Sequence, residues 1–306
     1  MSGRWRPSRA VQIIAGTPPG GGLDRVARAL AKAIEATRLI AVPLEVVNVP
    51  GGGARKAWTT VIDKHPGDGH VVAISSPNLT TDYLVGVADF EHSKYTPIAT
   101  LVTEYIAFAV RADSALRNGG DLLARLKNAA GPVVALSTAL GNPNHIALAK
   151  LVKQAGGDVN APAIRVFDSA LDCVAYVIAG QADVCAVTAA SVIPELNAGH
   201  LRVLAITAPA RLAAPFAAVP TWNQQGADCV IGAWRGLSGP SGLDPAQVKF
   251  WEDIVLAATL QPCWKQDLAR LSWSPQVATG AALRDGLASE RAEFVAVLGE
   301  LGLLKR

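Results

Sequence analysis

Short apolar runs alternate with stretches of helical periodicity along the first part of the chain. Residues 10–15 form a β-rich run, and residues 44–49 and 71–74 are further strand-like runs. Apolar side chains at three- and four-residue steps follow the first run, at Leu23, Val26, Ala27, Leu30, Ala31 and Ile34. A second helical stretch covers residues 54–63. This order of strand, loop and helix predicts a parallel sheet with helices on its faces.

The remainder of the chain repeats this order after a strand-like segment that lacks a helix. Strands are predicted at 133–136, 164–167, 184–187 and 201–207, and helices at 122–130, from His145 onward and at 170–179. Residues 98–110 and 230–237 are strand-like without a neighbouring helix, so we expect the chain to cross there between two lobes. Residues 245–304 have a mostly helical pattern and are expected to pack on the first lobe.

The composition fits two folded lobes and excludes several classes of protein. The chain has 306 residues, of which 50% are hydrophobic and 17% are charged. Its net charge of +3 comes from 28 basic and 25 acidic residues spread along the chain, without the basic run that predicts nucleic-acid binding. No apolar stretch of about 18 residues is present to cross a membrane. Residues 1–9 lack the apolar core of a signal peptide, so we expect either a cytoplasmic protein or an export signal that has been removed.

The cysteines give no sign of a metal site. Cys173, Cys185, Cys229 and Cys263 form no C-x-x-C pair and lie at no zinc-like spacing from a histidine. We therefore expect neither a metal nor a cofactor. An even number of cysteines allows none, one or two disulfides, and buried free thiols are the simplest interpretation.

The glycine-rich segment after the first strand is the most informative part of the sequence. It reads Pro18, Pro19, Gly20, Gly21 and Gly22. Glycines let a backbone approach a ligand closely, and the first turn of the following helix leaves bare N–H groups beside a partial positive charge. We therefore predict a carboxylate or phosphate site, and the alternative is a tight turn without a ligand. Asp24 is expected to cap or screen the first turn, and the spacing matches neither a P-loop nor G-x-G-x-x-G.

Two further polar loops follow predicted strands. The first contains Ser75, Ser76, Pro77 and Asn78, and the second contains Ser137, Thr138, Ala139, Leu140, Gly141, Asn142, Pro143, Asn144 and His145. Ligands of open parallel sheets gather outside the carboxyl ends of the strands, where such loops converge. Their hydroxyls, amides and backbone N–H groups suit an anion rich in oxygen, although Ser and Asn also cap helices.

The sequence gives little support for catalysis. It contains neither a G-x-S-x-G elbow nor an H-E-x-x-H motif, and nothing pairs Asp168 with Asp183 as acid and base. His145 opens a helix among polar residues, and a capping or packing role is the preferred interpretation. Trp234 falls at the second predicted crossing, where it could line a ligand cleft or pack in the core.

Taken in order, the motifs of the chain resemble the Bug/TctC family, the extracytoplasmic solute receptors of tripartite tricarboxylate transporters. These motifs are Pro18-Pro19-Gly20-Gly21-Gly22-x-Asp24, Asn48-Val49-Pro50-Gly51-Gly52-Gly53, Pro66-Gly67-Asp68-Gly69, Ser75-Ser76, Gly141 to His145, Gly180-Gln181-Ala182-Asp183-Val184, Pro194 with Gly199-x-Leu201-Arg202-Val203-Leu204-Ala205, Val219-Pro220-Thr221 and Trp234-x-Gly236-Leu237. The likeness runs nearly from end to end. Each motif is only moderately specific, but their order and spacing are distinctive.

The resemblance implies an α/β, two-lobed periplasmic binding protein fold of the type II kind, in which each lobe is a mostly parallel sheet flanked by helices. Lobe 1 would comprise residues 1–104 and 231–306, lobe 2 residues 105–230, and the ligand cleft would lie between them. The family holds a ligand carboxylate mainly by backbone amides and waters at the first strand–helix loop. In this chain that loop is Thr17 with Pro18 and Gly20 to Gly22, supplemented by the Ser75 and Ser137 loops.

The chain departs from the family pattern at two places. Phe167, Asp168 and Ser169 stand where members often carry Tyr-Lys-Gly or Tyr-Arg-Gly, and Val187 and Thr188 occupy the region where an aspartate is often found. The charge of Asp168 would repel a second carboxylate unless it faces away or pairs with a cation. A ligand with an amine or a hydroxyl at that end is therefore a further option.

We predict a periplasmic binding protein that captures a small carboxylate and delivers it to the membrane permease subunits of a tripartite tricarboxylate transporter. We expect a monomer without a catalytic residue, a metal or a nucleic-acid partner. Two alternatives stay open. One is a sensing module that docks on a membrane histidine kinase, and the other is an enzyme on the same scaffold with His145 as acid or base.

Overall fold

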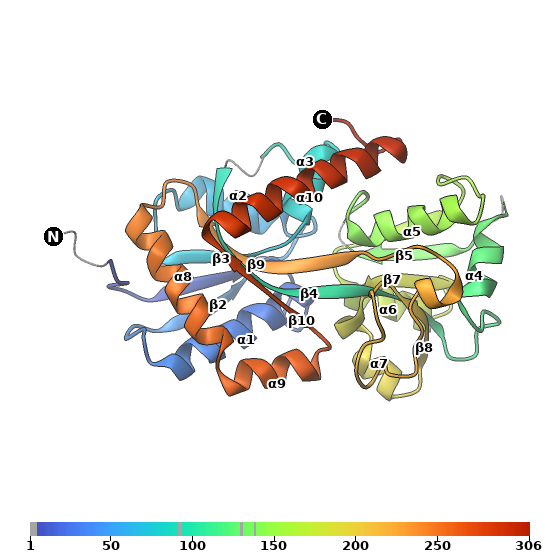
Figure 1. Cartoon of the computed structure of the whole chain (residues 1–306), viewed down its shortest axis with the longest axis horizontal. Coiled ribbons are helices and arrows are strands. Elements are labelled where there is room, and N and C mark those ends of the chain that lie inside the picture. Colours follow the sequence, from blue (N-terminus) through green and yellow to red (C-terminus); the bar gives the residue numbers. More distant parts are fainter. Residues whose placement is uncertain (1–4, 91–93, 129–130, 138) are drawn as a thin grey trace. The chain divides into compact units, whose positions relative to one another are not determined.

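The computed structural model describes residues 5–90, 94–128, 131–137 and 139–306. The chain divides into two compact units (Figure 1). Unit 1 comprises Met1–Thr103, Trp234–Ala296 and Arg306, and unit 2 comprises Glu104–Ala233 and Val297–Lys305. The end of the last helix therefore groups with unit 2, whereas the sequence assigned all of residues 231–306 to lobe 1.

Unit 1 is a sheet whose core strands are parallel. Its elements are β1 (Val11–Ala15), α1 (Gly22–Thr37), β2 (Leu44–Asn48), α2 (Arg55–Lys64), β3 (Val71–Ser75), α3 (Asn78–Leu84), the first part of β4 (Tyr95–Arg111), most of β9 (Gly232–Pro240), α8 (Pro245–Thr259), α9 (Pro262–Arg270), β10 (Ser274–Thr279) and most of α10 (Gly280–Glu300). β1 pairs in parallel with β2 and β3, β9 joins β3 antiparallel, and β10 joins β4 antiparallel.

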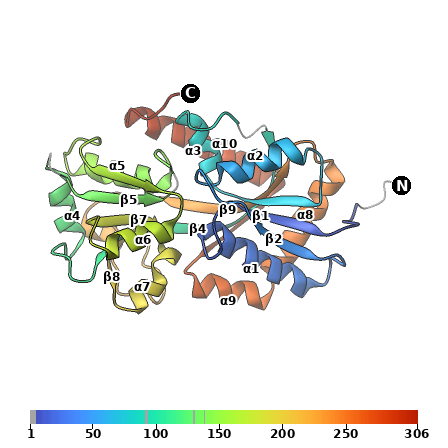
Figure 2. The same ribbon diagram turned by 180° about the vertical axis from the view of Figure 1, so that it is seen from behind.

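The apolar pattern of the first strand and helix explains the core of unit 1. β1 is buried along nearly its whole length, as expected of a parallel strand with neighbours on both sides and helices on both faces. The apolar stripe of α1, which includes Val26, Leu30 and Ile34, is fully buried and packs on the sheet and on α8 and α9. Figures 1 and 2 show α1 on one face of this sheet and α2 on the other.

Unit 2 repeats the same plan with a second sheet. Its elements are the end of β4, α4 (Gly119–Leu126), β5 (Val133–Ser137), α5 (Pro143–Gln154), β6 (Ala163–Phe167), α6 (Ala170–Ile178), β7 (Val184–Thr188), η2 (Ala189–Ser191), α7 (Ile193–Asn197), β8 (Leu201–Ile206) and η3 (Asn223–Gln225). β5 pairs in parallel with β6 and β7, while β4 pairs antiparallel with β7 and β8.

Two apolar clusters fill the two faces of the unit 2 sheet. One contains Leu148 and Leu151 of α5, and the other contains Cys173 and Val177 of α6. In both ribbon views α5 covers one face of this sheet and α6 covers the other. Each face is thus closed by a helix, as in other α/β domains with parallel strands.

Two strands differ from the sequence prediction. Residues 98–110, predicted as a strand-like crossing, lie within the longer 17-residue strand β4, although the buried Glu104 interrupts its apolar pattern. β10 was assigned to a helical region because its sequence, SPQVAT, contains a proline and few large apolar residues. β10 is held by antiparallel pairing with β4, and the register of this pairing shifts between Pro275 and Ala278. The local sequence pattern does not predict this pairing.

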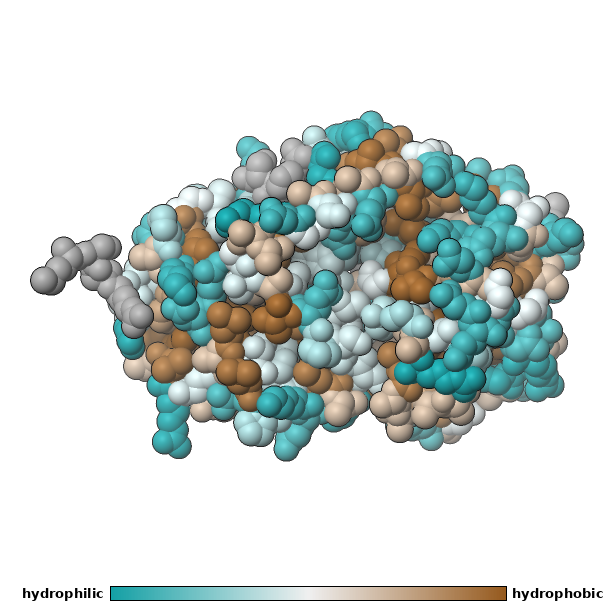
Figure 3. Space-filling view, viewed as in Figure 1, coloured by the Kyte–Doolittle hydropathy of each residue, from teal (hydrophilic) through white to brown (hydrophobic). Residues whose placement is uncertain are grey.

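The outer surface mixes polar and apolar side chains. Figure 3 shows hydrophilic and hydrophobic residues interspersed over one face of the molecule. The exposed large apolar side chains are distributed over both units, at Leu39, Val87, Leu140, Val166, Leu171, Val230, Leu256, Leu260 and Val277. Scattered single side chains of this kind are normal for a protein surface.

All four cysteines are free thiols in this structure. Cys173, Cys185 and Cys229 are buried, and Cys263 is half-buried. Burial raises the pKa of Cys185 and of Cys229 to about 12. These thiols are therefore protonated at neutral pH and act as small apolar side chains, which was the simplest of the interpretations left open by the sequence.

A close contact joins the end of β1 to the start of α2. A Cβ atom added to Gly16 would lie 2.3 Å from the Cβ of Ala54 and 2.8 Å from its Cα. Ala54 itself has a φ of +79°, in the left-handed region that favours glycine. The two loops therefore touch through backbone and methyl groups, with no space for a side chain at Gly16.

This contact predicts the effect of substituting Gly16. Gly16→Ala should lower the free energy of unfolding by about 1–3 kcal/mol because it overfills the contact, as measured by chemical denaturation. Adding Ala54→Gly should restore part of the loss, since it removes one of the clashing atoms and a strained φ. Gly286→Ala is the control, because a Cβ there meets nothing within 4 Å. A Gly16→Ala protein as stable as the parent would contradict this account.

Candidate functional site

Parallel pairing brings the ends of three strands to one edge of the unit 1 sheet. Ala15 at the end of β1 is aligned with Asn48 at the end of β2. Ile14 is aligned with Ala73, two residues before β3 ends at Ser75. The loops that follow β1, β2 and β3 therefore leave the sheet at the same edge, where ligands of open parallel sheets bind.

The first turn uses several of its own amide groups. Gly20 has a φ of +80°, and its N–H donates to Asp24 Oδ2 at 2.8 Å. The Gly21 N–H donates to the Pro18 carbonyl at 2.9 Å. The N–H of Asp24 donates to Thr17 Oγ1 at 3.1 Å. The expectation of bare donors throughout the triglycine turn is thus wrong for Gly20 and Gly21, because the turn closes on itself.

Two amides at the start of α1 are left over. In the part of the chain that the structure describes, the N–H groups of Gly22 and Leu23 have no acceptor. They belong to the first turn of a 16-residue helix, where no intrahelical acceptor is available. Pro19 is exposed and Pro18 is half-buried, so these residues shape the turn without supplying donors. The anion-binding capacity of the turn is therefore concentrated at Gly22 and Leu23.

Asp24 organises the turn from inside. Its carboxylate accepts from Arg28 Nε at 3.0 Å and from Asn48 Nδ2 at 2.8 Å, and Asn48 Nδ2 also donates to the Thr17 carbonyl. Burial alone would raise the pKa of Asp24, but the bonds from Arg28, Asn48 and Gly20 lower it below the ordinary value. Asp24 is therefore ionised at neutral pH and paired with protein groups, as expected for a residue that does not contact the anion.

The second glycine loop positions a cation. Gly51, Gly52 and Gly53 all have positive φ, which lets the chain turn tightly between β2 and α2. The first residue of α2 is Arg55, whose Nη1 lies 3.2 Å from Asp82 Oδ2. Arg55 was not among the predicted site residues, although its position two residues after a triglycine loop was a signal.

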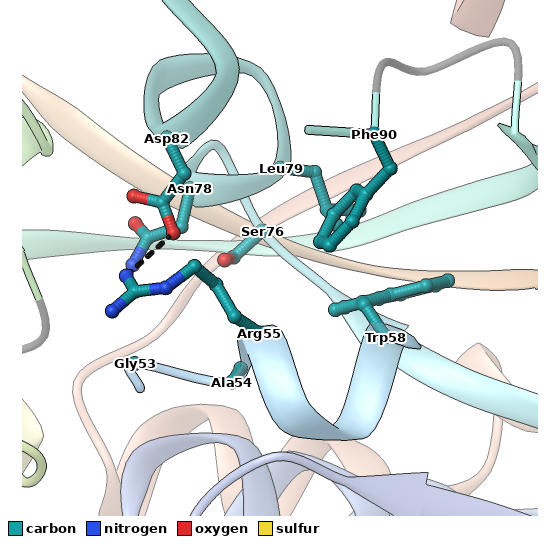
Figure 4. Close-up of a pocket in the computed structure, with 9 residues that line it drawn as sticks. All are labelled: Gly53, Ala54, Arg55, Trp58, Ser76, Asn78, Leu79, Asp82 and Phe90. Atoms are coloured by element: carbon teal, nitrogen blue, oxygen red, sulfur yellow. Dashed lines mark hydrogen bonds and ion pairs between the residues drawn. The ribbon is translucent and has the colours of Figure 1, made fainter. Parts of the chain in front are cut away.

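A small pocket lies beside this ion pair at the end of β3. Its lining residues come from α2 and the loop before it, from the loop between β3 and α3, and from α3 and the segment after it. They are Gly53, Ala54, Arg55, Trp58, Ser76, Asn78, Leu79, Asp82 and Phe90. Figure 4 shows the polar groups of Arg55, Asp82 and Asn78 on one side and the rings of Trp58 and Phe90 on the other. The cavity itself measures about 10 Å³, room for roughly one water molecule. Ser76 and Asn78, both predicted site residues, thus lie beside Arg55.

Ser75, by contrast, is used within the sheet. Its hydroxyl oxygen accepts from Ser238 Oγ at 2.9 Å, and its side chain is buried. A Cβ on Gly236 would lie 2.4 Å from the Ala99 carbonyl and 3.1 Å from Ser75 Oγ, so β9 passes closely here. Ser75 therefore holds the end of β3 to β9.

The predicted loop of unit 2 forms a helix cap. Asn142 Oδ1 accepts from the His145 N–H at 3.0 Å, and Asn142 Nδ2 donates to the Ser137 carbonyl at 2.6 Å. Asn144 Nδ2 donates to Ser137 Oγ at 2.8 Å. Leu140 is exposed, whereas Thr138 lies outside the described residues. The loop is thus ordered by its own amides and hydroxyl, at the carboxyl end of β5.

His145 has a packing role here. It is buried, and its Nδ1 accepts from the Gly141 N–H at 2.8 Å. Burial lowers the pKa of His145 to about 4. A neutral ring with Nδ1 already occupied is a poor general base at neutral pH, which agrees with the capping or packing interpretation.

The other predicted unit 2 residues share the same sheet edge. Phe167 is aligned with Ser137 across β6 and β5, and its ring packs on Tyr176 with centroids 5.0 Å apart. Asp168 is exposed. The hydroxyl of Thr188, at the end of β7, lies 3.1 Å from Ser191 Oγ. Their roles toward a ligand stay predictions.

Trp234 lines a cavity of unit 1. Its Nε1 donates to Oε2 of the half-buried Glu290 at 2.7 Å. The cavity measures about 160 Å³ and lies beneath α10. Its lining residues are Thr100, Trp234, Gln276, Ala278, Ala282, Leu283, Gly286, Leu287 and Glu290. Burial, reinforced by Glu293, raises the pKa of Glu290 to about 7 although the Trp234 bond opposes this.

Metal ligation and membrane crossing find no support in the described part of the chain. Nowhere in it do three His, Cys, Asp or Glu side chains come together so that they could hold a metal ion. No helix within the described ranges has both the length and the apolar character needed to cross a membrane.

The buried carboxylate of Asp24 predicts a stability effect with a defined pH dependence. Asp24→Ala should lower the free energy of unfolding by about 1–3 kcal/mol because the Gly20, Arg28 and Asn48 donors lose their acceptor. The folded-state pKa of Asp24 is lowered, so this contribution is complete above the ordinary value of 3.8 and is lost as the pH falls below it. Denaturant titrations at pH 7 and pH 3 measure both effects. The exposed Asp253→Asn is the control, and equal losses for the two variants would refute the role of Asp24.

Glu290 predicts the opposite pH dependence. Its folded-state pKa is raised from 4.5 to about 7, so the stability associated with the protonated carboxyl is complete below 4.5 and is lost as the pH rises through 7. Glu290→Gln keeps an acceptor for Trp234 and should flatten this loss, giving a higher Tm than the parent at pH 8. Thermal unfolding between pH 4 and 8 checks this, with the exposed Glu300→Gln as control. Parallel profiles for the parent and Glu290→Gln would rule it out.

Comparisons with known proteins agree with this architecture. The model of the tripartite tricarboxylate transporter family receptor, TctC, matches residues 26–297. The chain is 26% identical over 304 residues to protein BugT of Bordetella pertussis, which covers 97% of this chain and 90% of BugT.

Two solved structures confirm the predicted α/β periplasmic binding fold. A Rhodopseudomonas palustris protein with adipate has a TM-score of 0.87 at 19% identity, covering 97% of this chain and 98% of that chain. MatC from the same organism, with bound malate, has a TM-score of 0.82 at 20% identity, covering 95% of this chain and 99% of that chain. The family model spans most of the sequence and confirms the predicted resemblance. The chain belongs to the TctC family of tripartite tricarboxylate transporter receptors, and it is a periplasmic solute-binding protein rather than an enzyme.

Proposed function

We propose that this receptor captures a small carboxylate and delivers it to the membrane permease subunits of a tripartite tricarboxylate transporter. The receptor family supports the delivery role. Two proteins of similar fold were solved with the carboxylates malate and adipate, which supports the ligand class. The expected closure of two lobes over the ligand, and the ligand contacts of unit 2, stay predictions.

The single observation that carries the ligand class is the pair of unpaired amides at the start of α1. In the described ranges, the N–H groups of Gly22 and Leu23 donate to no protein atom, and they lie where the helix dipole is positive. The nearby charge of Asp24 is compensated by Arg28 and Asn48, so it does not cancel this attraction. A carboxylate oxygen is the simplest acceptor for two adjacent amides.

A charge-assisted bond from one amide is worth about 1.5–3 kcal/mol. Two such bonds, with neutral donors such as those of Ser76 and Asn78, are sufficient for roughly micromolar affinity when the rest of the ligand is also contacted. This strength suits a receptor that must release its ligand to a permease.

Gly22→Pro provides a direct test of the amide. Gly22 is the first helical residue, a position that accepts proline, and Gly21 has φ −70° and ψ 169°, the extended conformation favoured before proline. Helices α5, α8 and α9 already begin with proline. The substitution should therefore keep the fold while weakening carboxylate binding about 10- to 100-fold, as measured by calorimetry with adipate and malate.

Gly22→Ala is the matched control, because it retains the N–H and should bind within about twofold of the parent. Equal affinities for Gly22→Pro and Gly22→Ala would exclude this amide from the site. A thermal-shift screen of the parent completes the test, since a ligand that binds only the folded state raises Tm. A parent that responds to sugars or peptides and to no carboxylate would overturn the proposed function.

A further inference from the structure

We propose that Arg55 binds the second carboxylate of a dicarboxylate ligand. This inference rests on the proposed function, in which the amides of Gly22 and Leu23 hold the first carboxylate.

Arg55 lies at the same sheet edge as the first turn. The loop that carries it follows β2, and this loop touches the loop after β1 through Ala54 and Gly16. Ser76 and Asn78, from the loop after β3, lie beside the arginine. All the residues that line this pocket are described, and Arg55 is the only cation among them. A full positive charge is thus placed next to the neutral donors predicted from the sequence.

One nitrogen of the Arg55 guanidinium is paired with a carboxylate. Within the described residues, Nη1 forms a bond to Asp82 Oδ2 at 3.2 Å, while Nε and Nη2 form none. The side chain is 30% exposed, so these donors are accessible. A guanidinium carries five N–H donors in a planar fork that matches a carboxylate with two parallel bonds. Arg55 is therefore oriented by one contact and retains the geometry for another carboxylate.

Asp82 pairs with Arg55 through one of its two carboxylate oxygens. Its side chain is 3% exposed, and its Oδ1 is buried without a hydrogen-bond partner in the described structure. A buried ion pair that served stability alone would be expected to satisfy both oxygens. Burial raises the pKa of Asp82 to about 6, although Arg55 acts in the opposite direction. Asp82 is thus ionised at neutral pH and holds the arginine through a single oxygen, as a positioning residue.

The pocket beside the Arg55–Asp82 pair is too small to hold the ligand. Its cavity of about 10 Å³ has room for roughly one water molecule. The ligand carboxylate would instead approach the exposed edge of the guanidinium, with Asp82 behind it. Figure 4 shows the guanidinium between Asp82 and Gly53, turned away from the rings of Trp58 and Phe90.

The test compares ligands that differ by one carboxylate. Calorimetry would use adipate and its monocarboxylate analogue hexanoate on the parent, Arg55→Gln and Arg55→Lys. Arg55→Gln should weaken adipate binding at least about tenfold and leave hexanoate within about twofold, because only adipate presents a second carboxylate. Arg55→Lys should be intermediate, since it keeps the charge and loses the fork. Lys249→Gln, which removes an exposed cation from α8, controls for net charge.

Arg55→Gln could also disturb folding because it leaves Asp82 buried without a cation. The double variant Arg55→Gln with Asp82→Asn removes both charges and keeps a hydrogen-bonding pair, so it should fold with a Tm near that of the parent. It should lose the preference for adipate to the same extent. Asp82→Asn alone should strengthen adipate binding severalfold, because it removes the charge that competes with the ligand for Arg55 while it keeps a hydrogen bond to the arginine. It should have no further effect once Arg55 is replaced, as expected of a residue that acts through the arginine.

The outcomes separate this inference from the proposed function. Adipate affinity that stays within about twofold of the parent in the folded double variant would overturn the role of Arg55 while leaving carboxylate binding intact. An equal loss for adipate and hexanoate would also overturn it, because the arginine would then not distinguish the second carboxylate. A parent that binds neither acid, and no other carboxylate in the thermal-shift screen, would instead refute the proposed function.

Discussion

Parallel pairing of β1, β2 and β3 is the constraint on which the candidate site depends. Because the three strands run in the same direction, their loops emerge at one sheet edge, and residues far apart in sequence become neighbours. The contact of Gly16 with Ala54 then fixes how closely the first two loops approach. This contact therefore sets the positions of the turn before α1 and of Arg55 at the start of α2.

The two carboxylates at this sheet edge, Asp24 and Asp82, are each paired with an arginine of the protein, but to different extents. Asp24 is saturated by Arg28, Asn48 and the Gly20 amide, which makes it a fixed part of the turn. Asp82 is the reverse case, because within the described residues it pairs with one cation and leaves one oxygen without a hydrogen-bond partner, and its pKa is raised. A carboxylate whose oxygens all accept hydrogen bonds, such as that of Asp24, stabilises the fold. The Arg55–Asp82 pair instead leaves guanidinium N–H groups that a ligand can bind.

The sequence predicted the regular elements of this fold well because their signals are local. The apolar stripe of α1, the glycine turn before it and the Asn142 cap of α5 each depend on a few adjacent residues. The course of β10 was missed because its pairing with β4 depends on residues about 170 positions away. Local pattern cannot supply such information.

The same distinction applies to the candidate site. The glycine loop announced an anion site, but the capture of the Gly20 amide by Asp24 depends on how the turn closes on itself, which glycine content does not specify. The ion pair of Arg55 with Asp82 joins residues 27 positions apart on two helices, and neither residue forms part of a recognisable motif. His145 illustrates the opposite error, because its polar surroundings suggested chemistry while its burial depresses its pKa.

The proposed contacts explain how a receptor can bind a dianion and still release it. Main-chain amides act at short range and in fixed directions, so they lose most of their effect once a carboxylate moves away from Gly22 and Leu23. The proposed contact with Arg55 is weakened for a different reason. The guanidinium is already paired with Asp82. The binding free energy that the ligand gains from Arg55 is therefore smaller than the gain from an arginine without a carboxylate partner. A cation without such a partner would attract the ligand over a longer distance and hold it more strongly, which favours retention over delivery. A half-paired arginine at this sheet edge therefore suits transport better than a free one.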